Sequence, residues 1–200
     1  MDFETLALGL QVISEARLTL IDMPLGLLSG YRKGGRPCDQ LARKMLPRQN
    51  KSSVFSAPPR SILSCKSFEE AQKVMVAEGG GITLQTFHII RKIRELDEFV
   101  QDNSSLKIEE AHPEILFNRL KGEALASKKK REGREERVSL LKEAIGEMEW
   151  PPPKGLPKED CLDAAVLSWR AFKSTSLQLR TLGCEAEPLD PVGIPMRIVY

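Results

Sequence analysis

A short apolar run followed at once by an acid and a proline is the most informative part of the hydrophobic pattern. The run from Leu18 to Ile21 predicts a buried strand. Pro24 cannot donate to a strand ladder, so this strand ends before it. Ligands of open α/β sheets bind at the carboxyl ends of strands, which makes Asp22 a candidate site residue. An Asp that only caps the turn is the alternative.

The remaining periodicity predicts many helices and few strands. Alternation over 106–110 and an apolar run over 196–200 predict two more strands. Ser67 opens a capping-box pattern, and Pro37 and Pro113 suit the first positions of helices. The predicted helices cover 3–16, 37–45, 67–79, 83–101, 113–120, a segment within 121–148, and 159–172. We therefore predict an α/β fold in which helices dominate.

Length, cysteine usage and the N-terminus limit the class of protein. Two hundred residues suit a single domain over 1–200. The four cysteines form no C-x-x-C pair, which excludes zinc-ribbon and redox motifs and predicts reduced thiols in the cytoplasm. The N-terminus shows no signal pattern and no apolar run reaches transmembrane length, so we expect no membrane partner.

Charge is unevenly distributed although the net charge is only +2. Between residues 32 and 60 eight bases stand against the single acid Asp39. Such a segment predicts a surface that contacts phosphates, and its alternative is an ordinary solvated loop and helix face. The predicted phosphate-binding residues are Arg36, Arg43, Arg48 and Arg60.

Acidic residues recur at the ends and starts of the predicted elements. Clustered carboxylates bind hard cations such as Mg²⁺ or Mn²⁺, and two such ions support phosphodiester cleavage. The structural alternative is matching of the helix dipole for Asp160 and Asp163, and capping of the turn around His112 for Glu110. His112 itself is a candidate general acid or ligand, or a structural hydrogen-bonding residue. The predicted catalytic acids are Asp22, Glu110, Asp160 and Asp163, with Asp22, Asp160 and Asp163 as metal ligands.

Several short motifs follow one another in an order that resembles one family. They are IDMPLGL from Ile21, RPCD from Arg36, SVFSAP from Ser53, KIRELD from Lys92, EAHPE from Glu110, SKK from Ser127 and EDCLDA from Glu159. Together they resemble domain of unknown function family 429, predicted nucleases of the ribonuclease H-like superfamily. The resemblance covers nearly the whole chain.

The resemblance implies a ribonuclease H-like mixed sheet with flanking helices and a helix-rich insertion over about 30–105. Asp22 resembles the acid that ends the fourth strand of that sheet. Asp163 and Ala164, with Asp160 one turn earlier, are similar to the final-helix motif of Holliday-junction resolvases. One departure is that family members usually start with a strand carrying Gly-x-Asp-Gly, and this chain begins at the helix before the fourth strand. A misplaced start, a part supplied otherwise and a shortened inactive form are the three explanations.

Two classes of function follow from these expectations. The first is a Mg²⁺- or Mn²⁺-dependent nuclease that acts on nucleic acid. The second is a catalytically inactive protein of the same fold that binds nucleic acid or a small phosphorylated ligand. Without the first strands, the predicted strand at 18–22 has an open edge, so we also expect low stability alone, or a homodimer through that edge.

Overall fold

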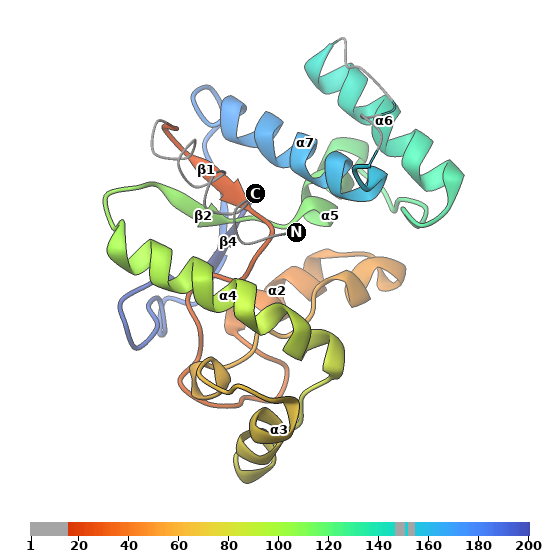
Figure 1. Ribbon diagram of the computed structural model, residues 1–200. Helices are drawn as coiled ribbons and strands as arrows, with labels where there is room; N and C mark the ends of the chain where they lie inside the picture. Colours follow the sequence, from red (N-terminus) through yellow and green to blue (C-terminus); the bar gives the residue numbers. More distant parts are fainter. Residues whose placement is uncertain (1–15, 147–150, 152–154) are drawn as a thin grey trace.

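The computed structural model describes residues 16–146, 151 and 155–200, and this part of the chain has a mixed α/β fold (Figure 1). The predicted helix at 3–16 and most of the proline-rich stretch at 150–153 lie outside the described residues. The helices are α2 (Pro37–Met45), α3 (Phe68–Ala77), α4 (Leu84–Asp102), α5 (Pro113–Lys121), α6 (Arg131–Ile145) and α7 (Lys158–Lys173), with 3₁₀ helices at Arg48–Ser53 and Arg60–Ile62. The strands are β1 (Thr19–Ile21), β2 (Ile108–Glu110), β3 (Thr181–Gly183) and β4 (Arg197–Val199).

Helix boundaries fall at local sequence signals. The Ser67 hydroxyl accepts the Glu70 N–H at 3.1 Å, and Thr83 accepts that of Thr86 at the same distance. These side chains satisfy backbone donors that the first helical turn leaves free. Gly122, at φ +80°, ends α5 in the left-handed conformation that glycine adopts without strain. The predicted helices in the described part of the chain are therefore confirmed.

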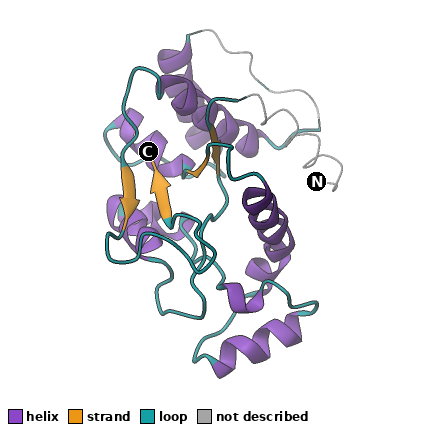
Figure 2. Cartoon of the chain, turned by 90° about the vertical axis from the view of Figure 1, so that its left-hand side faces the viewer, coloured by secondary structure: helices purple, strands orange, loops and turns teal. Residues whose placement is uncertain are grey.

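Two short pairs of strands form the sheet region, drawn in orange in Figure 2. β1 and β2 pair in parallel with Thr19 opposite Ile108 and Ile21 opposite Glu110. β3 and β4 are antiparallel, and a parallel bridge between Ala111 and Val199 joins the two pairs. Between β1 and β2 the chain passes through α2, α3 and α4. The long predicted helical segment thus leaves the sheet after β1 and returns to it at β2.

Helices pack against both faces of β1. Leu20 packs in a cluster with Val166 and Leu167 of α7, whereas Ile21 packs with Leu96 of α4. Consecutive strand residues point to opposite faces of a sheet, so both Leu20 and Ile21 meet apolar surroundings. Figure 1 shows α6 and α7 on one side of β1 and β2, and α4 and α3 on the other. No helix in the described residues has the length and apolar character that a membrane span requires.

Candidate functional site

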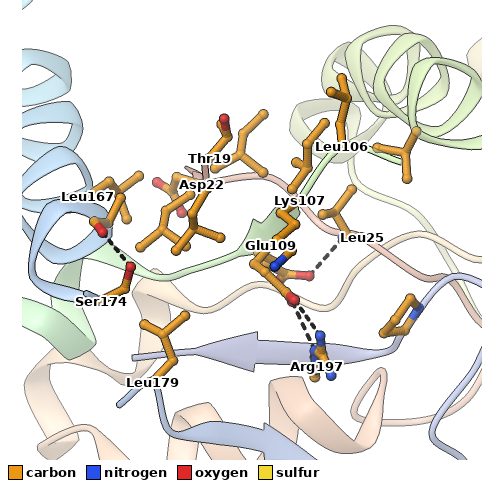
Figure 3. Close-up of a pocket in the computed structure, with 18 of the residues that line it drawn as sticks. Thr19, Asp22, Leu25, Leu106, Lys107, Glu109, Leu167, Ser174, Leu179 and Arg197 are labelled. Carbon is orange, nitrogen blue, oxygen red and sulfur yellow. Dashed lines mark hydrogen bonds and ion pairs between the residues drawn. The ribbon is translucent and has the colours of Figure 1, made fainter. Parts of the chain in front are cut away.

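Three of the four predicted acids come together beside β1. Asp22 follows the last residue of β1, and Asp160 and Asp163 lie on the first two turns of α7. All three line one groove, which Glu110 also lines; we call it the apolar groove because Leu18, Leu106 and Leu179 line it as well. Figure 3 shows Asp22 in its wall between Thr19 and the side chains of α7. We call Asp22, Asp160 and Asp163 the acidic cluster.

Asp22 is electrostatically coupled to the groups around it. The residue remains accessible to solvent, yet burial by the surrounding protein is the largest cause that raises its pKa. The carboxylates of Glu114 and Asp160 raise the pKa further, whereas His112 and Lys128 lower it. Holding a carboxylate next to other carboxylates is unfavourable unless a cation compensates. The arrangement at Asp22 thus favours binding of positive charge.

Asp163 is the most buried member of the cluster, with 8% of its surface exposed. Its Oδ2 accepts a hydrogen bond from Nζ of Lys128, while its buried Oδ1 has no partner among the described residues. Burial raises the pKa of Asp163, Lys128 lowers it, and Asp22 and Glu114 raise it again. An unpaired buried oxygen is costly, so Oδ1 is available to a ligand.

Glu110, the fourth predicted acid, forms a buried ion pair with Arg36. It is 7% exposed, and its two carboxylate oxygens each accept a hydrogen bond of 2.7 Å from the guanidinium of Arg36. Its Oε2 also accepts the Leu25 N–H at 2.7 Å. Burial raises the pKa of Glu110 and Arg36 lowers it. The structure therefore places Glu110 in an internal ion pair with Arg36, although the residue also lines the apolar groove.

Two of the four predicted phosphate-binding arginines, Arg36 and Arg60, form ion pairs with acidic residues of the protein itself. Arg36 is 1% exposed and also pairs with Asp39 of α2. Arg60 pairs with Asp97 of α4 and with Asp190 in the C-terminal segment. All the donors of the Arg36 guanidinium are engaged, and the partly buried Arg60 directs four of its five N–H donors to Asp97 and Asp190, which leaves little for a phosphate. Arg36 and Arg60 therefore hold distant segments together, and the basic segment does not form one phosphate-facing surface.

The other two predicted arginines lie nearer the surface. Arg43 donates to the backbone carbonyls of Val54, at 3.0 Å, and Gly34. Arg48 is exposed at the start of a 3₁₀ helix. Of the four, Arg48 is the residue whose position suits contact with an external phosphate.

Glu114 and His112 border the cluster without joining it. Glu114 is 4% exposed and receives two hydrogen bonds from Arg137, at 2.7 and 2.9 Å, and one from Asn50 at 3.2 Å. Nε2 of His112 lies 3.2 Å from the carbonyl oxygen of Ser53, and its buried Nδ1 has no partner in the described part of the chain. Glu114 is thus held in place, and His112 retains one free ring nitrogen close to Asp22.

A second basic segment lies beside the acidic cluster and was not among the predicted site residues. The bases in 128–131 stand at the start of α6, where the helix dipole disfavours positive charge. Lys128 and Lys129 line a pocket together with Asp22, Asp160 and Phe55, which we call the polar pocket. Four consecutive bases at a helix N-terminus are the sequence signal that could have identified this segment.

The acidic cluster fits a hard cation in its chemistry. Carboxylate oxygens are the preferred ligands of Mg²⁺, which is usually held by one or two carboxylates and keeps several water molecules. The unpartnered Oδ1 of Asp163 is the observation that supports such an ion. No group of three or more candidate ligand residues is gathered within the described residues, so a cage made only of protein is not formed there. The residues thus fit a partly hydrated ion held by few carboxylates.

Comparison with known proteins gives a family and nothing more specific. The family model described as "Protein of unknown function (DUF429)" matches residues 3–180 of the chain. No curated protein and no solved structure matches the chain.

Proposed function

The chain belongs to the DUF429 family of proteins of unknown function, and from this premise we propose that it is a metal-dependent phosphodiesterase that acts on nucleic acid. The observation that carries the proposal is the meeting of Asp22 with Asp160 and Asp163, from segments far apart in sequence, beside a run of bases. Carboxylates that hold Mg²⁺ or Mn²⁺ next to cations that attract phosphate are the parts such an enzyme needs.

We propose further that the fold is of the ribonuclease H-like type. The parallel pairing of β1 and β2 supports this, as does the packing of α7 against β1, which brings its two acids to the end of that strand. Acids at the carboxyl end of a strand and on a neighbouring helix are what the sequence resemblance implies for this superfamily.

Each group has a distinct role in the proposed reaction. A bound Mg²⁺ or Mn²⁺ would lower the pKa of water and stabilise charge on the phosphate oxygens. Oδ1 of Asp163 and the carboxylate of Asp22 would hold that ion together with water molecules, and Asp160 would add negative charge nearby. His112, whose charge acts on Asp22, would exchange a proton through its unpartnered Nδ1. The exposed Lys129 would contact the phosphate backbone from the polar pocket.

A second candidate function is binding without catalysis, of nucleic acid or of a small phosphorylated ligand. The observation that favours it is the ion pair between Lys128 and Asp163, which already neutralises one acid of the cluster. In that case the basic run would still bind phosphate, and Mg²⁺ would not change the affinity.

The edge of β1 supports a further proposal on assembly. Among the described residues β1 pairs with β2 alone, and its residues line the apolar groove. A homodimer through this edge would pair the free backbone groups. Light scattering should then give twice the chain mass, and a monomer at high concentration contradicts the dimer. The four cysteines are free, which suits our proposal of a reducing, cytoplasmic location.

A substrate panel tests the proposed function. Labelled single- and double-stranded DNA and RNA are incubated with the protein and Mg²⁺ or Mn²⁺, with EDTA as the control. We expect cleavage of at least one substrate that EDTA abolishes. Salt-sensitive binding without cleavage supports the second candidate function, and neither cleavage nor binding contradicts both nucleic-acid proposals.

A further inference from the structure

The polar pocket contains side chains that suit each part of a nucleotide. Its volume is about 1200 Å³, which is as large as the pockets of roughly 300–1,000 Å³ that bind small organic ligands. Lys129 supplies an exposed ammonium group for a phosphate, and Phe55 supplies an aromatic ring for the face of a base. Amides and hydroxyls that can pair with the edge of a base also line the pocket, namely Gln49, Asn50, Ser53, Ser56 and Gln85.

Phe55 is an exposed ring on a segment whose backbone is held in place. The ring is 42% exposed, whereas Val54 and Ala57 beside it belong to the core. Nη1 of Arg43 donates to the Val54 carbonyl at 3.0 Å, and the Ala57 N–H donates to Oδ2 of the buried Asp39 at 3.3 Å. A ring on a fixed backbone loses little conformational entropy when a ligand stacks on it. The segment therefore presents Phe55 to the pocket in a preorganised position.

Asn50 adds an acceptor without a partner to the wall of the pocket. The residue is 8% exposed, and its Nδ2 donates to Oε2 of Glu114 at 3.2 Å. A carboxylate only accepts hydrogen bonds, so this contact orients the amide. Its Oδ1 then has no partner among the described residues, although buried acceptors are normally paired. The N–H groups on the edge of a base are donors of the kind that this oxygen lacks.

His112 connects the segment that carries Phe55 with the acidic cluster. Its Nε2 lies 3.2 Å from the carbonyl oxygen of Ser53, two residues before Phe55. The charge of His112 also acts on Asp22, which lines the polar pocket together with Phe55. A nucleotide stacked on Phe55 would thus have its phosphates close to the acidic cluster.

We propose that the polar pocket binds an unpaired base of a single-stranded nucleic acid, which stacks on Phe55 while a phosphate contacts Lys129. This inference rests on the proposed function, whose substrate it narrows to a single strand. A base within a duplex is stacked between its neighbours, so a protein ring reaches its face only where the base is unpaired. Stacking tolerates different sequences because every base has a π-face.

Affinity for strands with and without bases tests this inference without metal and without cleavage. Fluorescence anisotropy is measured in EDTA with labelled single-stranded DNA and RNA, with their duplexes, and with a strand of the same length in which every nucleotide is abasic. We expect the single strands to bind at least about fivefold more tightly than the abasic strand, which is the lower end of the loss for one stacked base. Binding of only one of DNA and RNA supports the inference and identifies the sugar.

Variants at Phe55 assign the contact to this ring. Phe55→Leu should weaken binding of single strands at least about fivefold and leave binding of the abasic strand and of the duplexes unchanged. Phe55→Trp keeps a stacking ring and should bind single strands at least as tightly as the natural chain does. Its added fluorescence should be quenched by single strands and not by the abasic strand. Phe172→Leu is the matched control, because Phe172 is 72% exposed but lines the apolar groove.

The outcomes separate this inference from the function on which it rests. An affinity that Phe55→Leu leaves unchanged, or an equal loss for the natural and abasic strands, overturns the base site and leaves the proposed function standing. No binding of any strand overturns both the base site and action on nucleic acid. If circular dichroism shows that Phe55→Leu is unfolded, the fluorescence of Phe55→Trp decides, and the absence of quenching by single strands overturns the inference.

Discussion

Arg36 and Glu110, which are 74 positions apart, meet through two hydrogen bonds of 2.7 Å in the protein interior. The pair joins the start of α2 to the end of β2. Arg36 Nη1 also donates to the carbonyl of Leu25 at 2.7 Å, in the segment that follows β1. A single guanidinium therefore fixes the three segments that surround the carboxyl ends of the parallel strands.

Removing that guanidinium should destabilise the fold strongly. Arg36→Met leaves the carboxylates of Glu110 and Asp39 buried without their cation, which typically costs about 3–5 kcal/mol. Urea unfolding measures the loss. Arg32→Met is the matched control, because its pair with Glu187 is exposed and should contribute little. Equal effects of the two substitutions would contradict the role given to Arg36.

Neutralising Asp22 should stabilise the fold in a pH-dependent manner. Burial raises the pKa of Asp22 in the folded protein above its ordinary value of 3.8. The native state then binds the proton more tightly than the unfolded state does. The natural chain consequently loses stability as pH rises from about 3.8 through the raised value.

Asp22→Asn removes this loss. Its melting temperature should match that of the natural chain below pH 3.8 and exceed it increasingly toward pH 7, as measured by calorimetry. Glu185→Gln, at an exposed position, serves as the control. A difference that shrinks as pH rises would show that Asp22 is stabilised as an anion and would contradict the account.

The close contact between α6 and the 126–128 segment predicts an effect at Gly133. Gly133→Ala places a methyl group against the Ser127 carbonyl, and the overpacking should cost roughly 1–3 kcal/mol. This exceeds the gain in helix propensity from alanine, which is about 1 kcal/mol. Gly81→Ala meets nothing closer than 3.9 Å and should be nearly neutral. Thermal unfolding of both variants measures these effects. A Gly133→Ala variant as stable as the natural chain would mean that the 126–128 segment is not held against α6.

The exposed bases at the start of α6 should govern nucleic-acid affinity. Replacing both Lys129 and Lys130 by Ala should reduce the slope of log affinity against log salt by roughly 1.4–1.8, at about 0.7–0.9 per phosphate contact. Fluorescence anisotropy at several salt concentrations measures the slope. Lys73→Ala on α3, which lies far from α6 in Figure 1, should leave it unchanged. An unchanged slope in the double variant would place the contact elsewhere, with Arg48 as the next candidate.

Local signals made most of the secondary structure predictable from sequence. Ser67, Thr83 and Pro113 each act within one helical turn, so the sequence is enough to place the helices that they begin. Burial of charge was not predictable in this way. In α2 the apolar Met45 is 38% exposed, whereas the acidic Asp39 is buried, because Asp39 pairs with Arg36.

In the candidate site, too, local signals were predictable and the pairing of buried charges was not. Asp22 and Asp163 were predicted as site residues from two signals. Asp22 follows a predicted strand and Asp163 lies on a predicted helix, and the order of the family motifs implies that the two residues meet. Glu110 was predicted as a catalytic acid and Arg36 as a phosphate-binding residue, and only the tertiary structure shows that they satisfy each other. Lys128 was not among the predicted site residues because a run of bases is usually solvated, whereas in the structure it turns inward to Asp163, next to the close contact between Gly133 and Ser127.

The most direct test of the central claim is the rate of Mg²⁺-dependent phosphodiester cleavage by Asp163→Asn, measured against the natural chain and Glu185→Gln. The amide keeps the size of the side chain but removes the charge that would hold the ion and Lys128. We predict a loss of at least about 100-fold for Asp163→Asn, which corresponds to about 2.7 kcal/mol, and an unchanged rate for Glu185→Gln. Cleavage by Asp163→Asn at the rate of the natural chain would contradict the claim that the acidic cluster is the active site.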